Sequence, residues 1–122
     1  MALDPLLNEL KGVNGYMASA IMDFTGEMLA SHSSTTTVDL RVAGATFNDI
    51  FRGAHAAAGK VGFKAATDLV INTPEGTIVM MCTGVEQKAH LHLITILGKD
   101  GNQALAKMAM HKIAPEAMKQ LA

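Results

Sequence analysis

The most apolar pattern in the first part of the chain spans residues 15–33 and predicts a β-hairpin. Nearly every side chain in residues 16–24 is apolar or small on both alternating faces, which is typical of a strand covered on both sides. Residues 23–26 (Asp-Phe-Thr-Gly) begin with an Asp and end with a Gly, which tolerates positive φ, so they predict a turn. Residues 27–33 then return as a shorter and more polar strand. The pattern thus predicts a central strand with its hairpin partner.

Helical spacing before and after this hairpin predicts two amphipathic helices. A short helix starts at Asp4-Pro5, carries a stripe of Leu residues and ends at Gly12. A long helix is predicted from about residue 38 to 60, with a cap among residues 34–37. Apolar residues at steps of three and four form its predicted inner face: Leu40, Phe47, Ile50, Phe51, Ala54, Ala57, Ala58 and Val61. Its predicted outer side carries Arg41, Asn48, Arg52 and His55.

The second half of the chain predicts three strands and a closing helix. The strands are residues 65–73, 77–83 and 88–97, and the last is apolar on both faces, which places it in the middle of the sheet. A helix follows over residues 103–114, with Leu105, Met108 and Ala109 on its inner side, and Pro115 starts a last turn or kinks it. The predicted order is α-β-β-α-β-β-β-α.

With this order, the chain resembles the roadblock / dynein light chain family over nearly its whole length. The resemblance rests on Gly12-Val13-x-Gly15 before an apolar strand and on the turn Asp23-x-x-Gly26-Glu27. A polar loop before the long helix, three strands and a C-terminal helix complete it. Thr25 stands where many members have a second acidic residue, a departure from the pattern.

The resemblance implies a fold and a mode of assembly. It implies one α+β domain over residues 1–122: a profilin-like, five-stranded antiparallel sheet with the first and third helices on one face and the second on the other. It also implies a homodimer that joins third strands edge to edge and packs the second helices together. The interface residues implied here are Ala54, Ala57, Ala58, Val61, Asp68 and Val70. Asp68 argues against strand pairing, because a charge on an edge strand opposes it.

The resemblance further implies a function in protein–protein interaction. Such domains bind small Ras-like GTPases or assemble larger complexes, and they modulate nucleotide turnover on the partner. By analogy, partner-binding candidates are Arg41, Arg52 and His55 on the outer side of the long helix. A non-catalytic regulatory or scaffold module without cofactors is therefore expected.

Composition and charge argue against several other classes of function. The net charge of −1 and the absence of a basic run argue against a nucleic-acid partner. No apolar stretch approaches the ~20 residues that span a bilayer, so no membrane insertion is expected. The first residues lack the features of a signal peptide, and Cys82 is the single cysteine, so a cytoplasmic protein without an internal disulfide is expected. At 49% hydrophobic residues, the chain favours a partner that hides some of its surface.

One cluster of residues offers an alternative function. His90 and His92 alternate on one side of the last strand, and with His32, His55 or His111 they could bind a transition metal. Two histidines without Cys or carboxylate companions carry little weight, so no metal is expected. The alternative is nevertheless a small-molecule or metal-binding sensor that uses His90, His92 and nearby Met residues.

No pattern predicts an enzyme. Cys82 lies in an apolar strand and is expected to fill the core rather than act as a nucleophile. Glu75 and Glu86 lie in predicted turns, where carboxylates are usually solvated. The glycine-containing loops match neither a phosphate-binding loop nor a dinucleotide fingerprint. We therefore expect no catalytic residues.

Overall fold

The computed structural model describes residues 3–34, 38–84 and 88–121. A short 3-10 helix, Asp4–Leu7, leads directly into the first α-helix. The elements that follow are α1 (Asn8–Lys11), β1 (Tyr16–Asp23), β2 (Met28–Ser33), α2 (Leu40–Lys60), β3 (Asp68–Thr73), β4 (Gly76–Cys82), β5 (Leu91–Gly98) and α3 (Gln103–Leu121). This order confirms the predicted one. Among the described residues, no helix has the length and apolar character needed to cross a bilayer.

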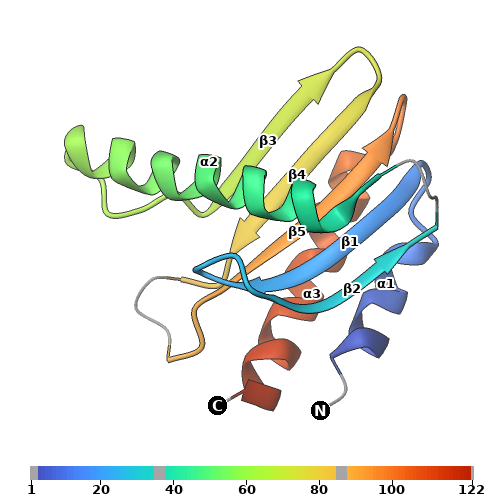
Figure 1. The fold of residues 1–122 in the computed structure, drawn as a ribbon, viewed down its shortest axis with the longest axis horizontal. Helices are drawn as coiled ribbons and strands as arrows, with labels where there is room; N and C mark the ends of the chain where they lie inside the picture. Colours follow the sequence, from blue (N-terminus) through green and yellow to red (C-terminus); the bar gives the residue numbers. More distant parts are fainter. Residues whose placement is uncertain (1–2, 35–37, 85–87, 122) are drawn as a thin grey trace.

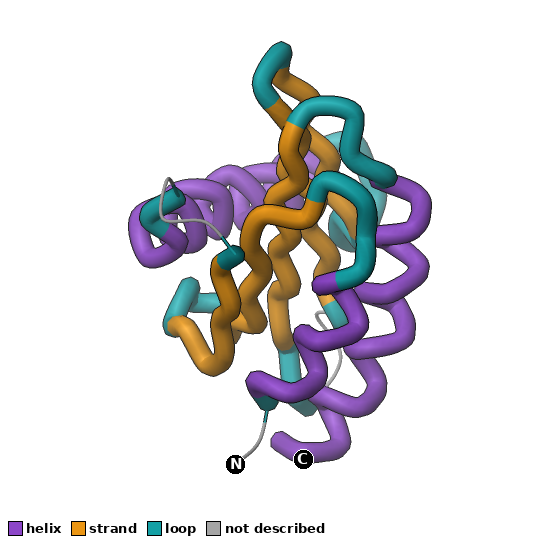
Figure 2. The backbone as a smooth tube through the Cα atoms, turned by 90° about the vertical axis from the view of Figure 1, so that its right-hand side faces the viewer, coloured by secondary structure: helices purple, strands orange, loops and turns teal. Residues whose placement is uncertain are grey.

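The strands form one antiparallel sheet in the order β2-β1-β5-β4-β3. Figure 1 shows α2 crossing one face of this sheet, and Figure 2 shows the sheet between two helical layers. The 3-10 helix, α1 and α3 cover the opposite face. The predicted profilin-like architecture, with helices on both faces, is confirmed. The central positions of β1 and β5 explain why both strands are apolar on both faces.

Each face of the sheet has its own core. Leu7, Ile21, Leu93 and Met110 belong to the core beneath α1 and α3. Phe51, Met80 and Ile94 belong to the core beneath α2. Alternation along the strands assigns successive side chains to the two cores, since neighbouring side chains of a strand point to opposite faces.

The buried face of α2 differs from the predicted one. Its N-cap is Asp39, whose side chain accepts a hydrogen bond from the Val42 N–H at 3.3 Å. The predicted cap among residues 34–37 was wrong for residue 34, and residues 35–37 lie outside the described part of the chain. The buried residues of α2 are Leu40, Gly44, Asn48 and Phe51, a stripe at steps of four and three.

This stripe corrects the prediction for the polar residues of α2. Asn48 is fully buried and the His55 ring faces the sheet, where it lies 5.5 Å from the His92 ring, whereas Ile50 and Val61 are 45% and 68% exposed. Hydrophobicity alone assigned these residues to the wrong sides, because Asn48 and His55 have polar partners inside the molecule and therefore tolerate burial.

The last helix corrects two further predictions. It continues through Pro115 to Leu121 rather than breaking near residue 114. Leu105 and Met108 were expected on the inner side, yet they are 42% and 68% exposed. The buried stripe consists instead of Ala106, Met110, Ile113, Ala114 and Ala117. The alanines of this stripe let α3 approach the sheet closely, and this packing outweighs the larger hydrophobicity of Leu105 and Met108.

Candidate functional site

The pairing of β4 with β5 brings a cysteine and two histidines together beneath α2. Cys82 is the cross-strand partner of His92, and His90 lies two residues earlier on the same side. α2 covers this face of the sheet and contributes His55. One potential ligand atom from each of these four side chains lies within 4.8 Å of the others. We call these four residues the His-Cys cluster.

A buried asparagine fixes the orientation of His92. The Asn48 side-chain N–H donates to the Phe24 carbonyl at 3.1 Å, so its Oδ1 faces His92. The distance between Asn48 Oδ1 and His92 Nδ1 is 2.6 Å, and Nδ1 is therefore the protonated nitrogen of a neutral ring. The lone pair of His92 then lies on Nε2, which is buried and has no hydrogen-bond partner.

His55 has the opposite arrangement of its ring nitrogens. The Ala66 N–H donates to His55 Nδ1 at 3.1 Å, so a neutral His55 carries its proton on Nε2. This Nε2 is also buried without a partner. The cluster thus contains an unpaired lone pair on His92 and an unpaired N–H on His55. Unpaired buried polar groups are uncommon, and they concentrate at sites that take a ligand or a water molecule.

Cys82 and His90 form a close pair within the cluster, in which Cys82 is buried and His90 is partly exposed. The distance from Cys82 Sγ to His90 Nε2 is 3.1 Å. The Gly84 N–H also points at this sulfur, at 3.3 Å, and favours a negatively charged thiolate over a neutral thiol. His90 is half-buried, so solvent reaches this side of the cluster.

Two phenylalanines surround the histidine rings. The Phe51 ring, which is fully buried, lies 4.8 Å from the ring centroids of both His55 and His92. The Phe24 ring stacks on His90 at 5.1 Å and is itself 47% exposed. The cluster is therefore dry on the side of the core, and Phe24 separates it from solvent on the other side.

The surroundings keep all three histidines neutral near pH 7. Burial, together with the neighbouring His90, His55 and Arg52, lowers the pKa of His92 to about 4, with Asp23 acting weakly in the opposite direction. Burial also lowers the pKa of His55 and, together with His55, that of His90. Burial raises the pKa of the Cys82 thiol, and the Gly84 N–H opposes this effect. Neutral imidazoles and a cysteine are donors for a borderline or soft metal ion.

The sequence predicted part of this cluster. His90 and His92 do face the same way, and their ring centroids lie 5.0 Å apart. Of the three histidines offered as a companion, only His55 belongs to the cluster. His32 instead contacts Tyr16 at the other side of the sheet, and His111 on α3 lies 3.9 Å from Asp68.

The proximity of Cys82 to the histidines was missed. Cys82 was expected to fill the core, and the histidine pair was expected to lack a Cys companion; the second expectation was wrong. The register of the hairpin formed by β4 and β5 was the signal that could have found it. Pairing Thr83 with Leu91, as the backbone hydrogen bond between them requires, places Cys82 opposite His92.

The other candidate residues lie along α2 and on β3. Ala57 and Val61 are exposed, and Ala54, Ala58, Asp68 and Val70 are partly exposed. Arg41 and Arg52 are exposed on the outer side of α2, as predicted, but His55 is not available there. Phe63, at 71% exposure, belongs to the same surface and was not predicted.

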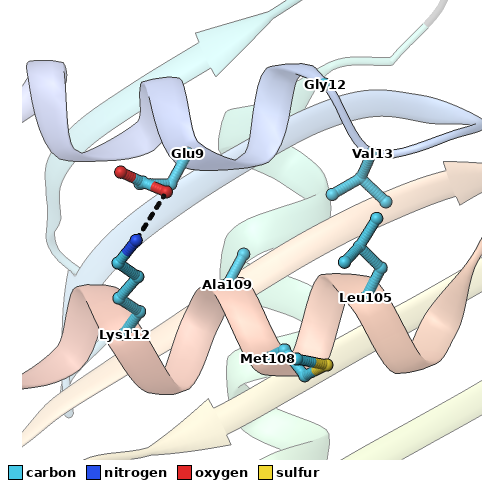
Figure 3. A pocket seen from close by; sticks show the side chains of 7 residues that line it. All are labelled: Glu9, Gly12, Val13, Leu105, Met108, Ala109 and Lys112. Atoms are coloured by element: carbon cyan, nitrogen blue, oxygen red, sulfur yellow. Dashed lines mark ion pairs between the residues drawn. The ribbon is translucent and has the colours of Figure 1, made fainter.

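A shallow groove of about 390 Å³ lies on the opposite helical layer, between α1 and α3 (Figure 3). Val13 and Leu105 face each other at one end, and the Glu9–Lys112 ion pair, with a distance of 3.6 Å, closes the other. Met108 lies along its rim. The groove contains no cluster of chemically reactive side chains.

Comparison with solved structures identifies the fold of the chain. No protein-family profile and no curated protein matches the sequence. A Roadblock/LC7 domain from Streptomyces avermitilis superposes with a TM-score of 0.85 at 13% identity, covering 99% of this chain and 98% of that one. The chain has the roadblock fold. Myxococcus xanthus MglB shares this fold with a TM-score of 0.76 at 13% identity, covering 98% of this chain and 90% of that one.

The roadblock fold also relates the chain to profilins. Acanthamoeba castellanii profilin IB superposes with a TM-score of 0.51 at 12% identity, covering 88% of this chain and 89% of that one. The resemblance predicted from the hairpin motifs is thereby confirmed as a shared fold.

Proposed function

We propose that the protein is a non-catalytic regulatory or scaffold module that forms a homodimer and binds a small Ras-like GTPase in the cytoplasm. The roadblock fold supports this proposal, since the resemblance implies that mode of action. The chemistry of nucleotide hydrolysis would belong to the partner. The observation that carries the proposal is an uncovered sheet edge beside an exposed apolar helix end.

The uncovered edge is β3, which pairs with β4 on one side only. In Figure 1 the C-terminal end of α2 extends past this strand, beyond the sheet. The exposed apolar side chains here include Val61 and Phe63, at 68% and 71% exposure, and Ala57 lies one turn before Val61. An unpaired strand edge and a neighbouring apolar surface together favour association with a second copy.

Asp68 does not prevent this pairing. Its carboxylate accepts a hydrogen bond from the Thr67 hydroxyl at 2.8 Å and lies near His111 of α3. The side chain therefore points toward its own α3 layer, whereas edge pairing uses the backbone N–H and C=O groups of β3.

Sedimentation of two variants tests the homodimer. Val61→Asp places a charge on the proposed interface, and we expect it to shift the protein from dimer to monomer. Met108→Asp is a matched control, because Met108 is also 68% exposed but lies on α3 in the opposite layer. A monomeric wild-type protein at high micromolar concentration contradicts the proposal, and so does dissociation caused by the control alone.

The GTPase partner requires a separate test. Arg41 and Arg52 remain as candidate contacts, since both are exposed on the outer side of α2. We expect affinity capture from a lysate of the native cell to retain a small GTPase whose turnover changes in the presence of the protein. Arg52→Glu should reduce capture, and Lys99→Glu, an exposed charge reversal in the loop before α3, should not. Capture that contains no GTPase contradicts this part of the proposal and leaves the homodimer result unaffected.

A further inference from the structure

We propose that Cys82, His90 and His92 bind a Zn²⁺-type transition-metal ion beneath α2, with His55 as a hydrogen-bond donor to the group that fills the fourth coordination position. This site is independent of the GTPase partner. It gives the chain a ligand of its own, held between the sheet and α2.

The spacing of the donor atoms suits such an ion. Zinc binds His nitrogen at about 2.0–2.1 Å and Cys sulfur at about 2.3 Å, so a tetrahedral site holds its ligand atoms ~3.3–3.6 Å apart. The atoms of Cys82 and His90 already lie 3.1 Å apart, and all four side chains offer an atom within 4.8 Å of the rest. Small side-chain rotations would bring atoms that lie at most 4.8 Å apart to these separations.

The hydrogen bonds around the cluster prepare two of the ligands. Asn48 holds the proton of His92 on Nδ1, which leaves the lone pair on Nε2 available to a metal ion. Ligand histidines in metal sites commonly make such a bond through their second nitrogen. The Gly84 N–H, at 3.3 Å from Sγ, stabilises the thiolate that zinc requires. On binding, the Cys82 thiol releases its proton to solvent and its sulfur forms the bond to zinc.

The second observation is the unsatisfied nitrogen of His92. This residue is fully buried, yet its Nε2 has no partner. Leaving such an acceptor unpaired in a dry environment costs stability, and a bound cation would satisfy it. The neighbouring rings of Phe51 and Phe24 exclude most solvent, while half-buried His90 leaves a route for the ion.

His55 differs from the other three residues in the position of its proton. Because Ala66 donates to its Nδ1, the Nε2 of His55 carries hydrogen and cannot ligate a metal. It can instead donate to a water molecule or a small anion bound at the fourth position. The metal would thus connect β4 and β5 directly and α2 through this hydrogen bond.

Zinc binding by the purified full chain tests the proposal. After treatment with a chelator and dialysis, we expect the wild-type protein to bind one Zn²⁺ per chain and to unfold at a higher temperature with Zn²⁺ than without it. Cys82→Ser and His90→Ala should each weaken binding by more than ~100-fold, beyond the 10–100-fold loss typical of an outer hydrogen-bond partner. His55→Ala should weaken binding less than either. His111→Ala, an exposed histidine on the far helical layer, should bind like the wild type.

Cobalt gives a readout that needs no variant. Co²⁺ bound by a thiolate in a tetrahedral site shows sulfur-to-cobalt charge transfer in the near ultraviolet and intense visible bands, and we expect both in the wild-type protein. Far-ultraviolet circular dichroism shows whether each variant is folded. Absence of stoichiometric Zn²⁺ binding together with a cobalt spectrum lacking the sulfur band overturns the proposal. Folded Cys82→Ser and His90→Ala proteins that bind Zn²⁺ as tightly as the wild type also overturn it, and a loss in His55→Ala equal to theirs refutes the role given to His55.

Discussion

Asn48 provides the sharpest test of how α2 is held to the sheet. Its side chain is fully buried and bridges two elements, because its N–H donates to the Phe24 carbonyl and its Oδ1 accepts from His92. Replacing it by Ala removes both bonds and leaves both partners in place. The expected consequence is a large loss of stability from a residue that hydrophobicity would place on the surface.

The magnitude follows from the surroundings of each partner. The His92 Nδ1–H is deeply buried, so losing its acceptor costs about 1–3 kcal/mol. The Phe24 carbonyl lies in a turn near solvent and can be rehydrated, so losing its donor costs about 0.5–1.5 kcal/mol. The sum predicts that Asn48→Ala lowers the free energy of unfolding by about 1.5–4.5 kcal/mol.

Urea denaturation followed by circular dichroism measures this change, since the chain has no Trp to serve as a fluorescent probe. Wild type and variant must be compared at one protein concentration, because self-association adds to apparent stability. Asp49→Ala is the matched control: it changes the next residue of α2, which is exposed, and should alter stability by less than about 0.5 kcal/mol. An Asn48→Ala protein as stable as this control would refute the assigned bridge.

Two further predictions concern the turns of the sheet. A Cβ on Gly76 would collide with the Leu97 carbonyl oxygen, so Gly76→Ala should lower the free energy of unfolding by about 1–3 kcal/mol. A Cβ on Gly12 would meet nothing within 4 Å, so Gly12→Ala is the control and should leave the free energy of unfolding nearly unchanged. Urea denaturation of the two variants checks this prediction. Burial raises the pKa of Asp23, but its carboxylate accepts hydrogen bonds from the Thr25 hydroxyl and from the backbone N–H groups of Glu27 and Thr25, and these bonds together outweigh burial and lower the pKa. Asp23→Ala should therefore cost about 1–2 kcal/mol at pH 7. Because the folded-state pKa is the lower one, this contribution is present above the unfolded value of about 3.9 and disappears as the pH falls through the folded value. Equal losses at pH 7 and at pH 3 would contradict this account.

The fold was predictable because its signals are local and mutually consistent. The two-faced apolar runs of β1 and β5 indicated central strands, and the turn at Asp23 and Gly26 indicated the hairpin between β1 and β2. Each of these features reflects side-chain alternation or turn chemistry within a few residues of sequence. The order of the elements followed from the same signals.

The inner faces of the helices were less predictable. Periodicity at steps of three and four allows several neighbouring stripes, and hydrophobicity selected the wrong one in both α2 and α3. Asn48 is buried because its partners come from β5 and from the turn after β1, which are distant in sequence. Met108 is exposed because Ala106 and Ala117 allow a closer approach of α3 than a larger side chain would.

The His-Cys cluster depended on information that no single segment contains. The alternation of His90 and His92 was visible in the sequence, but the contribution of Cys82 required the register between β4 and β5. His55 required knowledge of the face that α2 buries. A long-range site of this kind emerges only when the pairing of strands and the rotation of the helix are both fixed.

The position of the zinc ion is the measurement that tests the central claim most directly. Crystals of the full chain grown with Zn²⁺ would be measured for anomalous scattering at the zinc absorption edge. We expect a strong peak within bonding distance of Cys82 Sγ and of Nε2 of His90 and His92. A fully zinc-loaded crystal with no peak in this cluster, or with its zinc only at surface residues, would contradict this expectation.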